Sequence, residues 1–237
     1  MGNQQSHREL PANDTVATLY YFEGRGLADQ IRWMLAASEV SFTQRIVDSR
    51  KKFLKMKERQ LPFGQLPLLQ IDGLEIVQSQ SIVRYLARRA NLAGRTPEEI
   101  VKCEMIAETI KDLLPLLCGA PFARANSKEA LDKHLTSMKE KWSFVGSRLE
   151  AVLKANGGNY LVGESLTYAD ILTAHAVTWY VEECGPDVVA DMPNLVKLQN
   201  TVIALRGVNG FIRSSAFYPV SDKKYVDQVC LVLDRSI

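Results

Sequence analysis

The spacing of apolar residues changes near residue 91 and divides the chain into two parts. Before that point, short apolar runs typical of strands alternate with stretches in which apolar residues recur every three or four positions. The patterns predict strands over 16–22 and 41–47, helices over 27–38, 50–59 and 80–90, and a hairpin over 68–77. Asp72-Gly73 supplies the hairpin turn, because this pair suits type I′ geometry. The order of elements predicts a mixed sheet with helices on its faces.

Beyond residue 97 the pattern predicts only helices. One helix starts at Thr96, with Pro97 at its first position, and another starts at Ser127 and reaches about Ala155. The capping sequence 167–170 precedes the apolar run 171–181 of a third helix. Ser221-Asp222 marks the start of a terminal helix. Two shorter helices are expected over 194–206 and 208–213. We therefore predict a flexible tail over 1–14, an α/β domain over 15–92 and an all-α domain over 97–237.

Composition and charge narrow the classes of function. The chain is 46% hydrophobic and 24% charged, with a net charge of +2, which is too mild to indicate nucleic-acid binding. Its four cysteines lie far apart without a C-x-x-C pair, so we expect no metal site. Without a signal peptide they favour a reducing, cytoplasmic location. No apolar run approaches the length needed to span a bilayer.

The N-terminus, Met1-Gly2-Asn3-Gln4-Gln5-Ser6, matches the pattern for myristoylation of Gly2. A polar leader that carries Gly2 and Ser6 by chance is an equally good interpretation. A single acyl chain gives only weak, reversible membrane binding, so acylation would make the protein peripheral on membranes.

The chain is organised around residues 18–33, a short aromatic strand followed by a glycine turn and the start of a helix. Tyr21 ends the strand, and Tyr20 points to the opposite sheet face. A hydroxyl beside a helix N-terminus suits a small anionic ligand, although a lone tyrosine in this position is more often a core residue. Gly24-Arg25-Gly26 is not a dinucleotide motif, because Asp29 replaces the third glycine, so we expect no nucleotide cofactor.

Two further signals fall at the same end of the sheet. Leu66-Pro67 directly precedes a strand, and a cis peptide bond there would turn the backbone of Leu66 toward a ligand; a trans turn proline is equally compatible. Ser79, with Gln78 before it, is expected to cap the next helix. The same group of hydroxyl and N–H donors could hold a carboxylate.

The chain resembles the cytosolic glutathione S-transferases from about residue 16 to its C-terminus. The motifs that carry the resemblance are Tyr21-Phe22, Arg25-Gly26, Pro62-Phe63-Gly64-Gln65-Leu66-Pro67, Asp72-Gly73, Gln78-Ser79, Tyr160-Leu161-Val162-Gly163 and Leu166-Thr167-Tyr168-Ala169-Asp170. The resemblance is to the tyrosine-type classes: the segment Pro62-Phe63-Gly64-Gln65-Leu66-Pro67 is similar to the sigma class, and the tail over 222–226 looks like the alpha class. The resemblance implies a thioredoxin-like N-terminal domain, a helical C-terminal domain, a homodimer, and glutathione as co-substrate without any cofactor.

The resemblance also implies roles for individual residues. Tyr21 would donate a hydrogen bond to the glutathione sulfur and favour the thiolate. The peptide would be held by Gln65, by the backbone of Leu66 before Pro67, by Gln78 and Ser79 at the γ-glutamyl end, and by Asp112 from the partner subunit. Phe63 matches an aromatic residue that inserts into the partner in some classes.

The chain departs from the family pattern in three places. Leu27 stands where alpha and sigma members carry arginine, although the mu class also has leucine there. The basic residue for the glycyl carboxylate is ambiguous among Lys55, Lys57 and Arg59, and Lys57 has the best spacing from Phe53. The polar leader is an addition to the family's compact start.

The electrophile pocket rests on family analogy alone, and its residues could equally be core: Phe22, Gly24, Leu116, Phe122, Tyr225 and Val229. The leading hypothesis is a glutathione transferase that conjugates glutathione to small hydrophobic electrophiles. The alternatives are a glutathione-dependent isomerase of the prostaglandin D synthase type and a non-catalytic binding protein that keeps the fold. The presence of Tyr21, Gln65, Gln78 and Ser79 argues against the last.

Overall fold

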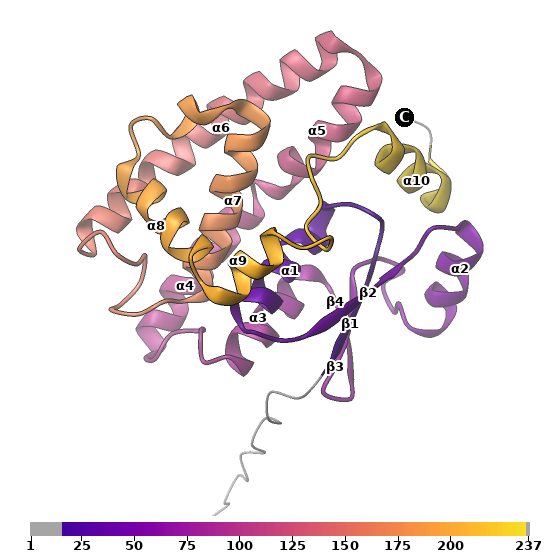
Figure 1. Cartoon of the computed structure of the whole chain (residues 1–237), viewed down its shortest axis with the longest axis horizontal. Coiled ribbons are helices and arrows are strands. Elements are labelled where there is room, and N and C mark those ends of the chain that lie inside the picture. Colours follow the sequence, from indigo (N-terminus) through magenta and orange to yellow (C-terminus); the bar gives the residue numbers. More distant parts are fainter. Residues whose placement is uncertain (1–15, 236–237) are drawn as a thin grey trace, which may run out of the picture.

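The computed structural model describes residues 16–235 and places a small sheet against a larger group of helices (Figure 1). The predicted tail over 1–14, with Gly2, lies outside the described residues. The predicted architecture of a small α/β unit followed by helices is confirmed.

The sheet has the order β2-β1-β3-β4. Its strands are β1 (Ala17–Tyr21), β2 (Phe42–Ile46), β3 (Leu68–Ile71) and β4 (Leu74–Val77). β1 pairs with β2 in parallel and with β3 antiparallel, and β3 and β4 form the predicted hairpin. Tyr21 therefore ends a central strand, with a paired neighbour on each side.

Three helices accompany the sheet: α1 (Asp29–Ala37), which follows a short 3₁₀ turn η1 over Gly26–Ala28, α2 (Arg50–Arg59) and α3 (Ser79–Arg89). The following helices are α4 (Pro97–Lys111), α5 (Leu114–Asn126), α6 (Lys128–Ala155), α7 (Tyr168–Cys184), the 3₁₀ turn η2 (Pro186–Val189), α8 (Pro193–Ile203), α9 (Arg206–Ile212) and α10 (Lys223–Leu233). The terminal helix α10 returns to the first domain and packs against α2 and α5.

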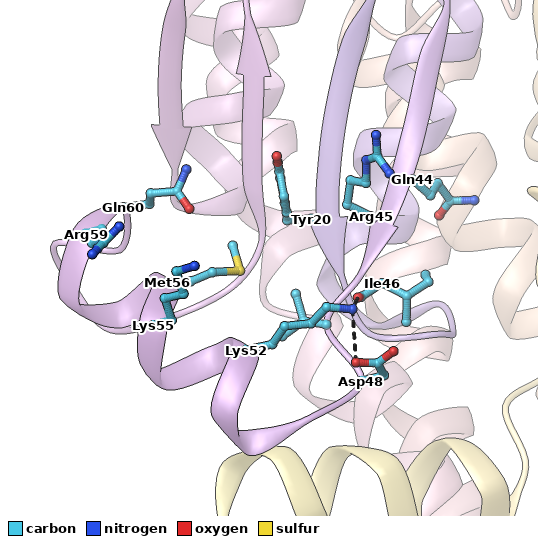
Figure 2. A pocket seen from close by; sticks show the side chains of 11 residues that line it. Tyr20, Gln44, Arg45, Ile46, Asp48, Lys52, Lys55, Met56, Arg59 and Gln60 are labelled. Atoms are coloured by element: carbon cyan, nitrogen blue, oxygen red, sulfur yellow. Dashed lines mark hydrogen bonds and ion pairs between the residues drawn. The ribbon is translucent and has the colours of Figure 1, made fainter.

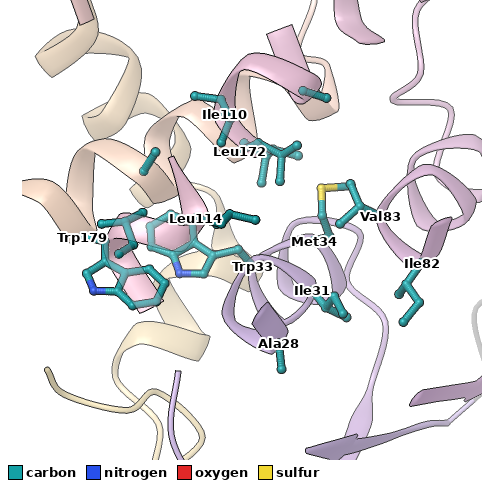
Figure 3. Close-up of a cluster of buried hydrophobic side chains, with 14 of the residues drawn as sticks. Ala28, Ile31, Trp33, Met34, Ile82, Val83, Ile110, Leu114, Leu172 and Trp179 are labelled. Atoms are coloured by element: carbon teal, nitrogen blue, oxygen red, sulfur yellow. The ribbon is translucent and has the colours of Figure 1, made fainter. Parts of the chain in front are cut away.

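α1 is the centre of the hydrophobic core. Every residue from Asp29 to Ala36 is buried, because α3, α7 and α9 all pack around this helix. Figure 3 shows Ile31, Trp33 and Met34 among side chains of α3, α5 and α7. A buried hydrogen bond of 3.1 Å between Asp29 Oδ2 and His175 Nε2 links α1 to α7. This packing fixes the helix that follows the Tyr21 turn.

The start signals read from the sequence are mostly confirmed. Thr96, Ser127 and Asp222 accept hydrogen bonds from backbone N–H groups in the first turns of α4, α6 and α10. The capping box of α7 is also present, with both Thr167 and Asp170 taking part.

The prediction that Ser79 caps α3 is wrong. Gln78 occupies the cap position with φ +69°, and Ser79 is already the first residue of α3. The Gln78 side chain makes no capping hydrogen bond, whereas its carbonyl accepts the first helical bond from the Ile82 N–H. The left-handed backbone of Gln78 starts the helix one residue earlier than the sequence pattern indicates.

Candidate functional site

The hydroxyl of Tyr21 lies in the turn between β1 and α1. The backbone N–H of Leu27 donates a hydrogen bond of 3.0 Å to Tyr21 Oη. Gly26 makes this approach feasible: its φ is +45°, and a Cβ atom there would lie 2.3 Å from Tyr21 Oη. The glycine turn therefore brings a hydroxyl and a backbone donor together, as the sequence predicts.

The surroundings of Tyr21 keep its hydroxyl protonated. Burial, together with the neighbouring Tyr225 and Cys118, raises the pKa of Tyr21 well above its ordinary value. The Leu27 N–H and the buried Arg32 guanidinium lower this pKa only in part. Tyr21 is consequently a hydrogen-bond donor at neutral pH and not a base. Arg32 therefore supplies a positive charge near the Tyr21 hydroxyl, which the uncharged Leu27 does not.

A cleft of about 930 Å³ opens between the start of α3 and the junction of α4 and α5. Leu27, whose N–H contacts the Tyr21 hydroxyl, lines this cleft, whereas Tyr21 itself does not. Gln78, Ser79 and Asp112, all predicted from sequence, line it together with Leu27. Asp112 lies in the same cleft as Gln78 of its own chain, and its predicted role in the partner's site stays a prediction. The N-terminus of α3 also offers backbone N–H donors that an anion could accept.

Sequence reasoning missed several residues that line this cleft: Arg84, Glu108, Lys111 and Cys118. Arg84 and Lys111 form ion pairs with Glu108, so the rim carries a mixed charge pattern. Arg84 lies four positions after Gln80 on α3, so the two residues share one helix face, and this spacing is a signal in the sequence. Burial raises the pKa of Cys118 to about 12, so its thiol stays protonated.

The glycyl end of the predicted glutathione site is formed by α2 and the loop after it. The Lys57 side chain packs on Gly64, where a Cβ atom would lie 3.0 Å from Lys57 Cε. Lys55 and Arg59 instead line a separate hollow. Gln65 is exposed, and the Leu66–Pro67 bond is cis. The geometry thus favours Lys57 over its two neighbours beside Gln65.

The predicted electrophile pocket is only partly assembled. Gly24 and Tyr225 line a hollow of about 210 Å³ beneath α10, and the Phe122 ring lies 6.5 Å from that of Tyr225. Phe22 and Val229 are buried and do not line this hollow, and neither does Leu116.

Helix α10 closes over the glycine turn. The Glu23 N–H donates to Gln228 Oε1 at 2.8 Å, and Lys224 Nζ lies 3.4 Å from a Glu23 carboxylate oxygen. The Tyr225 ring covers Gly24 so closely that a Cβ atom there would lie 2.3 Å from the ring. Access to Tyr21 from this side therefore depends on α10.

Residues 16–235 contain no group of three metal-binding side chains placed to hold an ion. No helix in this range is long and apolar enough to cross a membrane.

Comparison with known proteins identifies the family. Residues 17–88 match the model of the glutathione S-transferase N-terminal domain, and residues 111–215 match a model of the C-terminal domain. Glutathione S-transferase A4 of Mus musculus is 36% identical over 218 residues, covering 91% of this chain and 96% of the mouse protein.

Two solved structures share the fold. Monomeric Na-GST-3 of Necator americanus aligns with a TM-score of 0.72 at 27% identity, over 84% of this chain and 97% of its own. Prostaglandin synthase D of Nilaparvata lugens aligns with a TM-score of 0.70 at 26% identity, over 84% of this chain and 98% of its own. The chain belongs to the glutathione S-transferase family.

Proposed function

We propose that this protein conjugates glutathione to small hydrophobic electrophiles, with Tyr21 holding the glutathione sulfur as a thiolate. The observation that carries the proposal is the position of the Tyr21 hydroxyl, which accepts a hydrogen bond of 3.0 Å from the N–H of Leu27, a residue that lines the same cleft as Gln78 and Ser79. Burial raises the pKa of Tyr21, so the hydroxyl keeps its proton. A proton-bearing donor at that position stabilises a sulfur anion without giving up its own proton.

The decrease in the glutathione thiol pKa that this mechanism requires is modest. A free thiol has a pKa near 8.5, so only a few per cent is thiolate at neutral pH. Lowering that pKa by two units needs about 2.7 kcal/mol of differential stabilisation. One hydrogen bond to a charged acceptor together with a helix N-terminus supplies this amount. The thiolate then attacks the electrophilic carbon, a carbon–sulfur bond forms, and the leaving group departs with the electron pair.

Glutathione is the co-substrate and binds along the edge of the first domain. Lys57 and Gln65 hold the glycyl end, and the backbone of Leu66, before Pro67, pairs with the cysteinyl part. Gln78 and Ser79 hold the γ-glutamyl group. The geometry that supports this placement is the position of Lys57 against Gly64, next to Gln65.

The electrophile binds beneath α10, next to Gly24 and Tyr225. Tyr218 and Tyr225 give this hollow aromatic surface, which favours flat substrates, and its lining also includes the charged Glu23, Asp222 and Lys224. Because Tyr225 sits over Gly24, α10 acts as a lid that opens for substrate entry.

The functional unit is a homodimer. Phe63 is 67% exposed, and on α4 Met105 is 65% and Val101 55% exposed. Val101 and Met105 lie four positions apart on α4 and share one helix face, so they form an exposed apolar patch of the kind that another protein covers. In the dimer Phe63 inserts into the partner subunit, and Asp112 reaches the partner's glutathione.

The protein acts in the cytoplasm, and N-myristoylation of Gly2 gives it weak, reversible membrane association. The sequence pattern at residues 1–6 supports this modification, and Gly2 lies outside the described residues. Mass spectrometry of the native N-terminus tests it: an acylated Gly2 is expected, and a retained, unmodified Met1 contradicts it.

Activity with glutathione and a chlorinated nitroaromatic tests the proposed function. The wild type turns over, and Tyr21→Phe lowers kcat by about a hundredfold, as removal of one donor to a reacting anion typically does. Glutathione binding without turnover would favour a non-catalytic binding protein. Equal activity of Tyr21→Phe and wild type would contradict the role of Tyr21.

The isomerase alternative is favoured by one observation, the shared fold with a prostaglandin synthase D. An assay with a prostaglandin endoperoxide and glutathione distinguishes the two: net isomerisation leaves the glutathione concentration unchanged, whereas conjugation consumes it.

A further inference from the structure

The segment over 214–221 joins α9 to the lid helix α10, and we call it the stem. It lies outside the helices and strands, so contacts with other segments determine its position. Figure 1 shows the stem passing α5 on its way to α10, and α10 then runs next to α2 in the lower part of Figure 2. The position of the stem therefore decides where α10 lies over the glycine turn.

Two arginines from different elements hold the stem. Arg25, in the turn after β1, donates from Nε to the Tyr218 carbonyl at 2.8 Å. Arg124, on α5, donates from Nη1 to the Ser221 carbonyl at 3.0 Å. Ser221 is buried and directly precedes Asp222, whose side chain caps α10. The stem is therefore held at two points, and the second adjoins the start of the lid.

Both arginines use further N–H groups to pair with carboxylates at the end of α7. Arg25 pairs with Glu182, and Arg124 Nη2 pairs with Glu183. The Glu183 side chain is fully buried, whereas that of Arg124 is 32% exposed. Because a buried carboxylate without a cation is strongly unfavourable, Glu183 holds the Arg124 guanidinium in place. A second N–H group of the same planar fork then faces the stem.

The contacts of Arg124 continue as far as the glycine turn. The backbone N–H of Tyr225 donates to Asp222 Oδ1 at 3.2 Å, which ties this tyrosine to the end of the stem. The Tyr225 ring covers Gly24 on one side and meets the Phe122 ring of α5 on another. A displaced stem would therefore carry Tyr225 away from both contacts.

We propose that Arg124 is a positioning residue for electrophile binding, because it holds the stem through Ser221 and so sets the position of Tyr225. This inference rests on the proposed transferase function, in which the electrophile lies beneath α10. Arg124 does not line the hollow beneath α10, so it acts through the lid and not by touching the substrate. With the stem held, the lid moves from Asp222 onward while 214–221 stays in place.

Hydrogen exchange and steady-state kinetics of Arg124→Lys test the proposal. Lysine keeps a positive charge next to Glu183, but it lacks the planar fork that reaches Ser221 at the same time. We expect faster exchange over 223–233 and unchanged exchange in α7. KM for a chlorinated nitroaromatic is expected to rise by about threefold or more, as loss of one hydrogen bond predicts. Unchanged kcat and unchanged KM for glutathione accompany this rise, because only binding of the electrophile is weakened.

Arg213→Lys is the matched control, because Arg213 is exposed at the end of α9 and makes no side-chain hydrogen bond or ion pair within residues 16–235. Its exchange and kinetics stay at the wild-type level. Three results would overturn the proposal: unchanged exchange over 223–233 in Arg124→Lys, an equal increase in Arg213→Lys, or an equal increase throughout α7, which would indicate general loosening.

A second variant covers the case in which Arg124→Lys impairs folding. Combining Arg124→Gln with Glu183→Gln removes both charges together and leaves no buried ion unpaired, and the same pattern is expected. The exchange measurement also separates this inference from the proposed function. Without any transferase activity, α10 still loses protection in the variants if Arg124 holds the stem. Full activity with unchanged protection contradicts the role of Arg124 alone.

Discussion

The Tyr21 hydroxyl is positioned by a glycine and a backbone N–H group more than by charged side chains. Gly26 lets the hydroxyl approach the turn, and the Leu27 N–H holds it at 3.0 Å. The missing positive charge at Leu27 is partly replaced by Arg32, which is fully buried and lowers the pKa of Tyr21. Position 27 is therefore compatible with a working tyrosine.

Gly24→Ala tests the contact between the turn and the lid. The new methyl group meets the Tyr225 ring, so the ring must move and α10 must loosen. We expect KM for a hydrophobic electrophile to rise by about tenfold, as loss of ~1.4 kcal/mol of binding predicts. Hydrogen exchange over 223–233 is expected to become faster.

Gly210→Ala is the matched control, because a Cβ atom at Gly210 meets no heavy atom within 4 Å. If hydrogen exchange in α10 is the same in Gly24→Ala as in the wild type, Tyr225 does not close the site.

The sequence motifs predict Tyr21, Gln78 and Ser79 as site residues, since each lies at a strand end or a helix start, and their roles stay predictions. Among Lys55, Lys57 and Arg59, the sequence favours Lys57 only by its spacing from Phe53. These residues fall on different faces of α2, and only the structure shows that Lys57 meets Gly64.

Among the elements, α7 depends on one buried carboxylate. Asp170 accepts hydrogen bonds from the N–H groups of Leu161 and Thr167 and from the Thr167 hydroxyl, at 2.7–2.8 Å. Burial raises the pKa of Asp170 to about 6, so the group is still ionised at neutral pH. Its oxygens therefore satisfy three donors in a region without access to water.

Asp170→Asn is expected to lower the free energy of unfolding by about 2–4 kcal/mol, because an amide nitrogen cannot accept a hydrogen bond and leaves buried donors unsatisfied. Urea denaturation measures the change. Asp191→Asn serves as a control, since Asp191 is exposed and makes no side-chain hydrogen bond within the described residues. Equal stability of Asp170→Asn and wild type would contradict the role of the capping box in holding α7.

Element starts were more predictable than element ends and contacts. Thr96, Ser127 and Asp222 are residue types that favour the N-cap position, so the sequence alone predicts where these helices start. The left-handed backbone of Gln78 has no such signal. The position of α10 over Gly24 results from packing between segments about 200 residues apart, as the Glu23–Gln228 bond shows.

For the whole molecule, the proposed homodimer predicts that Asp112 contributes to the site of the partner subunit. Mixed dimers of a Tyr21→Phe subunit and an Asp112→Ala subunit test this prediction. If Asp112 acts across the interface, one of the two sites in each mixed dimer contains both native residues, and activity recovers to about half of wild type. If Asp112 acts within its own chain, each site of the mixed dimer lacks one native residue, and activity does not exceed the average of the two parent homodimers.

Differently tagged subunits, co-expressed and purified by both tags, provide the sample for this measurement. Activity no greater than the average of the two parent homodimers would contradict the contribution across the interface. Elution of the wild type as a monomer would contradict the homodimer itself.

The central claim is that Tyr21 lowers the pKa of the bound glutathione thiol. Ultraviolet absorbance of the thiolate, followed against pH in the enzyme–glutathione complex, measures that pKa directly. The wild type is expected to titrate about two units below the free thiol value near 8.5, and Tyr21→Phe to titrate close to the free value. Because the pKa of Tyr21 itself is raised, its own ionisation does not contribute in this range. The same midpoint in both proteins would contradict the account.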